Sequence, residues 1–255
     1  MHLIRSHLLS FLTGLVLLVS PLAAQSFYGS DDFNDNAFAS GRWGSFATQN
    51  GGAWTETNGR MEFTGDATSI AINSGNRVQQ MRLWSNNTVS SSYTDTWTAS
   101  ASFTIDTAAV SSNGVIMMGL ETFAATTDAG YYGVYLLSAT SGSRIFTERG
   151  IWNGTGYNRV TLGSTGLLNL SFDTTNVLLE TRYNPSTNAL TTAFSFDGGT
   201  TYYDFTTGGG TNAFGGAASF TVTNWAASAA DGFGLDIYGA YYGDGVNPGQ
   251  ILASG

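Results

Sequence analysis

Hydrophobic and polar residues alternate with a period of two along most of the chain, and clusters of turn-forming residues separate the alternating runs. This pattern is typical of β-strands with one buried face, and no long amphipathic helix is predicted. One such run carries Trp97, Ala99, Ala101, Phe103 and Ile105 at every second position. Further strands are predicted over 115–121, 131–137, 167–172, 177–183, 189–196 and 233–238. The turns recur evenly and no linker stands out, so we predict one all-β domain, an antiparallel two-sheet sandwich.

Residues 54–63 predict a β-hairpin together with its register. Asn58-Gly59 lies at the centre of the segment, and this dipeptide favours a two-residue turn because both turn positions need a positive φ. Such a turn pairs Thr57 with Arg60 and extends outward from there. The face expected to be buried consists of Trp54, Glu56, Met61 and Phe63. We expect Glu56 to lie close enough to the turn to remain hydrated.

The first 24 residues have the pattern of a secretory signal peptide. Arg5 lies in a polar start, an apolar stretch over 8–19 follows, and Ala23-Ala24 offers small residues for cleavage. The apolar stretch is too short to cross a bilayer as a helix, so an uncleaved anchor is the less favoured alternative. We therefore predict a signal peptide over 1–24 and a single β-sandwich domain over 25–255. The protein is expected to be secreted, at the cell surface or in the periplasm, and a leader without any cysteine downstream favours a bacterial source.

The residue types that the chain lacks exclude several kinds of chemistry. There is no cysteine, all 9 basic residues are arginine, and the 2 histidines (His2 and His7) lie in the predicted leader. This excludes Ser-His-Asp and Cys-His nucleophiles, His/Cys zinc sites and Schiff bases. Loss of Arg5 with the leader leaves 8 basic against 18 acidic residues, a net charge of 8 − 18 = −10, which repels nucleic acid and anionic lipid.

Several motifs resemble the concanavalin A-like lectin/glucanase domains of secreted bacterial proteins. They are the opening Asp-Asp-Phe-Asn-Asp over 31–35, Trp43 shortly after it, and the hairpin over 54–63. The hairpin around Asn184 and the strand over 233–238 also fit, so the resemblance spans about residues 27–255. It implies a jelly roll with one concave sheet, which often binds glycans, and sometimes a structural Ca²⁺. Many relatives end on a further strand with an Asp-Asn-Phe-like motif, whose absence here predicts a short or missing closing strand.

Carbohydrate binding is the first candidate function, because sugars combine apolar CH faces with hydroxyl edges and are bound by aromatic and polar side chains together. Strand alternation places Tyr131, Gly133 and Tyr135 on one face, where Gly133 is expected to leave room for a ligand. Trp152 and Asn153 adjoin turn residues and are expected to be exposed. The predicted sugar-binding residues are Tyr131, Tyr135, Arg149, Trp152, Asn153 and Tyr157. The alternative for each aromatic residue is ordinary packing inside the sandwich.

A structural calcium ion is the second candidate feature. Asp32-x-Asn34-x-Asn36 has the alternating oxygens of a calcium loop but lacks the later positions of an EF-hand. The predicted ligands are Asp31, Asp32, Asp35 and, from a distant part of the chain, Asp236. The alternative is a solvated run of Asp and Asn that caps turns.

Glycoside hydrolysis needs only two carboxylates beside the scissile bond. Glucanases of the family that the chain resembles carry them on one strand as Glu-x-Asp-x-x-Glu, and no glutamate of this chain has that spacing. Glu121, at the end of an apolar strand, is the one glutamate considered for the concave face. We therefore predict a secreted, non-catalytic carbohydrate-binding or cell-surface module. The alternatives are a glycan hydrolase with Asp or Glu on the concave sheet, and a structural surface or matrix protein without a specific ligand.

Overall fold

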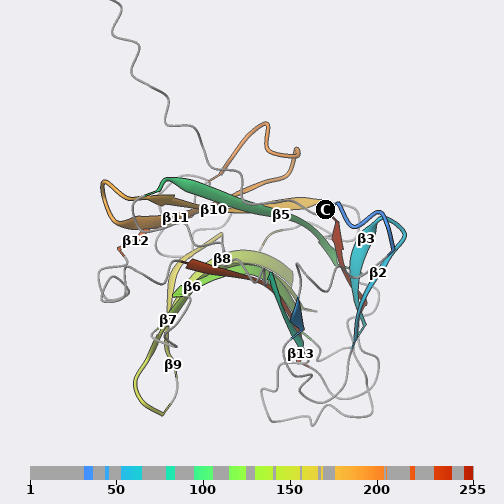
Figure 1. The fold of residues 1–255 in the computed structure, drawn as a ribbon, viewed down its shortest axis with the longest axis horizontal. Helices are drawn as coiled ribbons and strands as arrows, with labels where there is room; N and C mark the ends of the chain where they lie inside the picture. Colours follow the sequence, from blue (N-terminus) through green and yellow to red (C-terminus); the bar gives the residue numbers. More distant parts are fainter. Residues whose placement is uncertain are drawn as a thin grey trace, which may run out of the picture.

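The computed structural model describes residues 32–36, 44–45, 53–64, 79–83, 95–105, 115–124, 130–139, 142–155, 157–165, 168, 176–203, 205, 219–221, 233–242 and 250–254. The predicted signal peptide lies outside these ranges. The described residues form strands and turns, with no helix among them, and so none that is long and apolar enough to span a membrane. The strands build two antiparallel sheets that pack face to face, as the prediction of an all-β jelly-roll sandwich required (Figure 1).

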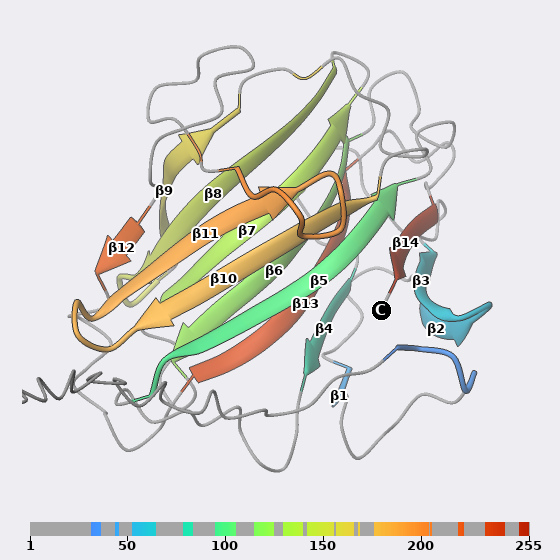
Figure 2. The same cartoon turned by 90° about the horizontal axis from the view of Figure 1, so that it is seen from above.

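One sheet, which we call the curved sheet, bends so that its concave face points away from the other sheet (Figure 1). Its strands are, in spatial order, β1 (Gly44–Ser45), β4 (Gln79–Leu83), β13 (Phe233–Tyr242), β6 (Val115–Ala124), β7 (Gly130–Ala139), β8 (Gly142–Trp152) and β9 (Tyr157–Ser164). The second sheet, which we call the opposite sheet, contains β12 (Ser219–Thr221), β11 (Ala189–Ser195), β10 (Val177–Asn184), β5 (Trp97–Ile105), β14 (Gln250–Ser254), β3 (Arg60–Thr64) and β2 (Ala53–Thr57). Figure 2 shows the central strands of the opposite sheet lying over those of the curved sheet and running in roughly the same direction.

The main hydrophobic core lies between the two sheets. Alternate residues of each strand contribute to it, because successive side chains of a strand point to opposite faces. The curved sheet supplies Met118, Leu120, Val134, Leu136, Ile145 and Ile237. The opposite sheet supplies Met61, Phe103, Ile105, Val177, Leu179 and Phe194. This assignment fixes which face of each strand is inside, and it leaves the other face of the curved sheet for the residues described in the next section.

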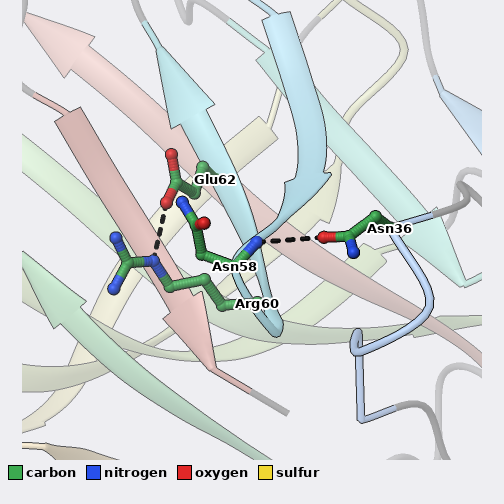
Figure 3. Close-up of polar contacts among 4 residues, drawn as sticks. All are labelled: Asn36, Asn58, Arg60 and Glu62. Carbon is green, nitrogen blue, oxygen red and sulfur yellow. Dashed lines mark hydrogen bonds and ion pairs between the residues drawn. The ribbon is translucent and has the colours of Figure 1, made fainter.

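The hairpin predicted around Asn58-Gly59 is confirmed in its register. Thr57 pairs with Arg60 and Glu56 with Met61, and both turn residues have positive φ (56° and 71°). The expected hydration of Glu56 is wrong, because this side chain is only 5% exposed on the buried face beside Met61. Polar residues around the turn have hydrogen-bond partners among the described residues. The Arg60 Nε donates to Glu62 Oε1 over 2.7 Å, and the backbone N–H of Asn58 donates to Asn36 Oδ1 over 3.0 Å. Figure 3 shows both contacts.

The closing strand that was expected to be short or missing is present, and it is 5 residues long. β14 lies inside the opposite sheet, where it pairs with β3 on one side and β5 on the other. Its sequence, Gln-Ile-Leu-Ala-Ser, contains apolar residues that suit a strand with neighbours on both sides. Of the strand predicted over 167–172, only Leu168 is described, and it forms an isolated bridge with Ser143.

A compact turn follows β11 and folds back onto the outer side of the opposite sheet. Asp197 organises it, because its carboxylate accepts hydrogen bonds from the Thr201 amide over 2.8 Å and the Ser195 hydroxyl over 2.7 Å. The Ser195 hydroxyl in turn accepts the Gly199 amide over 2.9 Å. The hydrogen bond from the Thr201 amide, and then that from Ser195, lower the pKa of Asp197 below its ordinary value of 3.8.

The lowered pKa of Asp197 gives a pH-dependent prediction. A carboxylate with a depressed folded-state pKa stabilises the fold above its unfolded-state pKa of about 3.9, and this contribution is lost as the pH falls through the folded-state pKa. Asp197→Asn is therefore expected to lower the melting temperature at pH 7, and the difference from the wild type should begin to shrink below about pH 4 and disappear below the folded-state pKa. Thermal unfolding of both proteins from pH 7 to pH 3 measures this. A difference that stays constant over that range would contradict the account.

Candidate functional site

The concave face of the curved sheet carries a row of acidic residues that runs across its strands. The register pairs Asp236 of β13 with Glu121 of β6, Glu121 with Gly133 of β7, and Gly133 with Glu148 of β8. We call the positions Asp236, Glu121 and Glu148 the carboxylate row. Glu121 is buried and Glu148 is half-buried. Carboxylates in one row of a sheet are rare without a reason, because like charges on facing strands destabilise the pairing.

Aromatic rings lie on both sides of the carboxylate row. On one side Tyr135 stacks on Phe146 with 5.1 Å between ring centroids and meets Tyr238 edge to face at 5.7 Å. On the other side lie Phe123 and Tyr131, which face glycines of the neighbouring strands. Together these residues form a second hydrophobic cluster outside the intersheet core. The row of acids is therefore enclosed by apolar walls, in which hydrogen bonds to the carboxylates are stronger than in water.

Glycines leave the space that the aromatic rings occupy on this face. The Tyr135 ring lies where Gly119 and Gly133 lack a side chain: a Cβ at Gly119 would come within 2.3 Å of its Cδ1 atom, and one at Gly133 within 2.3 Å of its hydroxyl. The Tyr131 ring covers Gly150 in the same way, with 2.2 Å between its Cε1 atom and the Cβ position. The rings thus lie down along the sheet, and each hydroxyl is carried to the neighbouring carboxylate.

Tyr135 donates its hydroxyl to Glu121. The distance between the Tyr135 hydroxyl and Glu121 Oε1 is 2.6 Å, within the range of charge-assisted O–H···O⁻ bonds. Burial raises the pKa of the Tyr135 phenol well above its ordinary value of 10.0, and the negative charge of Glu121 raises it further. The phenol therefore remains protonated at neutral pH and acts as a hydrogen-bond donor.

Tyr131 performs the same role for Glu148. Its hydroxyl lies 2.5 Å from Glu148 Oε1, and both residues lie on the face that carries Tyr135. The negative charge of Glu148 also contributes to the raised pKa of Tyr135, so the two tyrosine–glutamate pairs are close enough to interact. Adjacent strands lie about 4.8 Å apart, so the backbones of Glu121 and Glu148, with β7 between them, are about 10 Å apart. A ligand that lies across β7 can reach the half-buried Glu148 directly, whereas Glu121 is only 4% exposed.

Two of the predicted sugar-binding residues, Tyr131 and Tyr135, lie on this concave face, but neither offers an open ring. Their exposed fractions are 5% and 2%. The space that Gly133 was expected to leave for a ligand is filled by the Tyr135 phenol. Both tyrosines therefore hold the carboxylates in position, while Glu148, which is more exposed, lies nearer to solvent.

The other predicted sugar-binding residues are divided between this face and its surroundings. Arg149 pairs with Tyr132, whose side chain is in the core between the sheets, so strand alternation separates Arg149 from Tyr131 and Tyr135. Trp152 pairs with Tyr157 across β8 and β9, at positions that alternate onto the face of Glu148. Asn153 lies exposed in the turn between these strands, where its Oδ1 accepts the Thr155 amide over 3.0 Å.

Of the carboxylate row, only Asp236 was predicted as a site residue from the sequence, and as a calcium ligand; the other two acids and one cation beside them were missed. Glu121 was considered, but Glu148 and Arg159 were not singled out. Arg159 of β9 pairs with Gly150 and is exposed, and Thr161, also exposed, pairs with Glu148. The signal that would have revealed them is the alternation of β8 and β9, which places Glu148 and Arg159 on the face of Tyr131 once the hairpin register is known.

The predicted calcium ligands are not brought together by the described residues. Asp32 and Asp35 are exposed on either side of Phe33, which anchors the segment in the core, and this segment contacts the β2–β3 turn through Asn36. Asp236 lies in the curved sheet between β4 and β6, and Asp31 lies outside the described residues. Within the described part of the chain, no group of three or more acidic or histidine side chains is arranged to hold a metal ion. The calcium site stays a prediction.

Comparison with known proteins gives matches in structure. No family model matches the chain, and no curated protein matches it. A mutant of the GH43 protein BlXynB from Bacillus licheniformis is similar with a TM-score of 0.56 and 13% identity, over 87% of this chain and 37% of that chain. The chain thus spans little more than a third of the length of that protein.

Two further solved structures are matched over most of this chain and most of their own length. An endo-1,3-beta-glucanase from Streptomyces sioyaensis matches with a TM-score of 0.49 and 12% identity, over 88% of this chain and 91% of that one. Peanut lectin matches with a TM-score of 0.44 and 14% identity, over 85% and 91%. Identities this low concern the fold alone. The chain has an antiparallel two-sheet jelly-roll sandwich, a fold that it shares with part of the GH43 protein.

Proposed function

We propose that this protein is an exported carbohydrate-binding domain and that its glycan lies along the carboxylate row. The observation that carries the proposal is the pair Glu121 and Glu148, each held by a tyrosine hydroxyl on the concave face. A sugar presents several hydroxyl donors at fixed spacing, and a carboxylate oxygen has acceptor capacity left after one hydrogen bond. Tyr131 keeps the half-buried Glu148 in place before the ligand arrives, which lowers the entropic cost of binding.

The edge formed by β8 and β9 supplies groups that complement a sugar. Arg159 and Thr161 are exposed there and add donors beside the half-buried Glu148. The positions of Trp152 and Tyr157 extend the same face with aromatic residues, which suit the apolar faces of pyranose rings. Export follows from the leader predicted over residues 1–24, and it would bring the protein into contact with extracellular or cell-surface polysaccharide.

A glycan array with the purified protein, followed by calorimetric titration of the best oligosaccharide, tests this function. Glu148→Gln keeps the shape of the side chain and removes its charge, so it is expected to weaken binding about tenfold or more, the value of a charge-assisted hydrogen bond. Glu62→Gln is the matched control, because Glu62 also bonds to a neighbouring side chain, that of Arg60, but lies in the opposite sheet. Absence of binding to any glycan, or equal losses in both variants, would contradict the proposal.

Glycan hydrolysis is the second candidate function, and one observation favours it. Glu121 and Glu148 lie in the same row with only Gly133 between them, and a pair of carboxylates flanking a glycosidic bond is what this reaction requires. Incubation of the bound oligosaccharide with the protein, followed by measurement of new reducing ends, separates the two functions. A hydrolase releases reducing ends that are lost in both Glu121→Gln and Glu148→Gln, whereas a binding domain releases none.

A further inference from the structure

A second polar cluster lies on the outer face of the opposite sheet, on the far side of the molecule from the carboxylate row. The turn over 195–203 folds back over this face, as seen from above in Figure 2. It brings Tyr202 onto Glu180 and Arg182 of β10. The inward-facing residues of the same strand, such as Leu179 and Tyr183, belong to the core between the sheets, which fixes the cluster on the outside.

Arg182 is held in one orientation by its two neighbours. Its Nε forms an ion pair with Glu180 Oε1, and its guanidinium lies over the Tyr202 ring, 4.7 Å from the ring centroid. The Tyr202 hydroxyl donates to the other oxygen, Glu180 Oε2, over 2.6 Å, which fixes the carboxylate as well. The Glu180 side chain is only 7% exposed while that of Arg182 is 49% exposed. The ion pair therefore holds the inner side of the guanidinium, and its outward edge faces solvent.

Hydroxyl side chains flank this guanidinium on both neighbouring strands. Arg182 pairs with Thr98 of β5 on one side and with Thr191 of β11 on the other. Ser100, which pairs with Glu180, continues the hydroxyl row along β5. Thr98 and Ser100 are exposed and Thr191 is half-buried. The planar guanidinium of Arg182 is thus flanked on both neighbouring strands by neutral hydroxyl groups, which can both donate and accept hydrogen bonds.

We propose that this cluster is a second binding site, which takes the carboxylate of an acidic saccharide such as a uronic acid. A guanidinium held on one side and open on the other matches a carboxylate through two parallel N–H···O bonds. The flanking threonine and serine hydroxyls suit the ring hydroxyls of a sugar. An acidic peptide fits less well, because β10 is an inner strand and presents no free backbone edge to which an extended peptide could add.

Because the net charge of the protein is negative, the affinity of this site for an anion depends on the geometry of the Arg182 guanidinium. The chain carries a formal charge of −9, which repels a polyanion at long range. Glu180 also neutralises part of the positive charge of Arg182. Attraction by a point charge alone is therefore weak here, and binding has to come from the bidentate contact. A lysine at this position keeps the charge but cannot form that contact, so Arg182→Lys separates the two effects.

Titration of the intact domain with tetragalacturonate, followed by NMR chemical shifts, tests the proposal. The fully methyl-esterified tetrasaccharide is the ligand control, since it keeps the sugar and loses the carboxylates. We expect the acid form to bind, the ester to bind at least about tenfold more weakly, and Arg182→Lys to reduce binding of the acid form by about the same factor. Arg144→Lys is the matched protein control, because Arg144 is also exposed and lies 5.3 Å from the centroid of an aromatic ring, on the curved sheet.

Several outcomes would overturn the site. They are no binding of tetragalacturonate, equal binding of the ester, and equal losses in Arg182→Lys and Arg144→Lys. Tighter binding of tetraglutamate than of tetragalacturonate at Arg182 would overturn the assignment to a saccharide. Tyr202→Phe removes only the hydroxyl that fixes Glu180 and gives a second, gentler variant, for which we expect a smaller loss of affinity. The amide shifts of Thr98, Ser100 and Thr191 report on this site, whereas those of Gly133 and Thr161 report on the concave face, so failure of one proposal is distinguished from failure of the other.

Discussion

Replacing Gly119 by alanine is expected to destabilise the protein by about 3 kcal/mol, the upper range for inserting a group into a packed site. The new Cβ would come within 2.6 Å of the Val134 carbonyl oxygen and 2.3 Å of Tyr135 Cδ1. The backbone oxygen cannot move without disturbing the β6–β7 pairing, and the ring is held between Phe146 and Tyr238. Urea unfolding of the purified variant measures the loss.

Gly234→Ala is the matched control for this prediction. A Cβ at Gly234 would also meet a ring, that of Phe123 at 2.2 Å, and its three nearest contacts all belong to this one side chain. Phe123 is half-buried rather than enclosed, so its ring can swing away. We expect a loss of about 1 kcal/mol, at the lower end of the range for such insertions. Equal stability of Gly119→Ala and the wild type would show that Tyr135 does not lie over Gly119, and the position of Glu121 would have to be revised.

Replacing Trp97 by alanine is expected to cost about 4 kcal/mol, because a large buried side chain is removed and a cavity remains. Trp97 is 1% exposed and links the two sheets: it stacks on Tyr183 with 6.0 Å between centroids and meets Phe233 edge to face at 5.1 Å. Thermal or urea unfolding measures this loss.

Trp97→Phe should be much milder, at about 1 kcal/mol, since it keeps most of the ring contacts. Within the described part of the chain, the Trp97 Nε1 has no hydrogen-bond partner although it is buried. Phenylalanine removes this unsatisfied donor, which offsets part of the lost packing. If the phenylalanine variant were as unstable as the alanine variant, a polar interaction of Nε1 would have to be contributing, against the structure.

Local patterns predicted most of the central strands. The runs that became β5, β6, β7, β10 and β13 are strongly alternating or wholly apolar, and their positions were predicted correctly to within a few residues. The register of the β2–β3 hairpin followed from the Asn58-Gly59 turn alone, because a two-residue turn leaves one pairing. In contrast, β4 and β14 have sequences without a clear signal, and both are placed by long-range pairing with strands distant in the chain.

The candidate site was harder to predict because it depends on register between strands. The face shared by Tyr131 and Tyr135 followed from alternation within one strand. That Glu121 and Glu148 lie in the same row across Gly133 requires knowing which strands are neighbours and how they are offset. Arg149 illustrates the same limit, because it lies next to the predicted sites in sequence but one residue out of phase with them in the sheet.

The most direct test of the account is to locate a bound oligosaccharide on the protein by NMR chemical shifts of the backbone amides. The account predicts that the glycan selected on an array perturbs the amides of Glu121, Gly133, Glu148 and Thr161, which lie in one row of the curved sheet. These perturbations should be lost in Glu148→Gln while the rest of the spectrum is retained. Perturbations confined to the opposite sheet, or a row that stays unchanged at saturating glycan, would contradict the assignment of the concave face as the binding site.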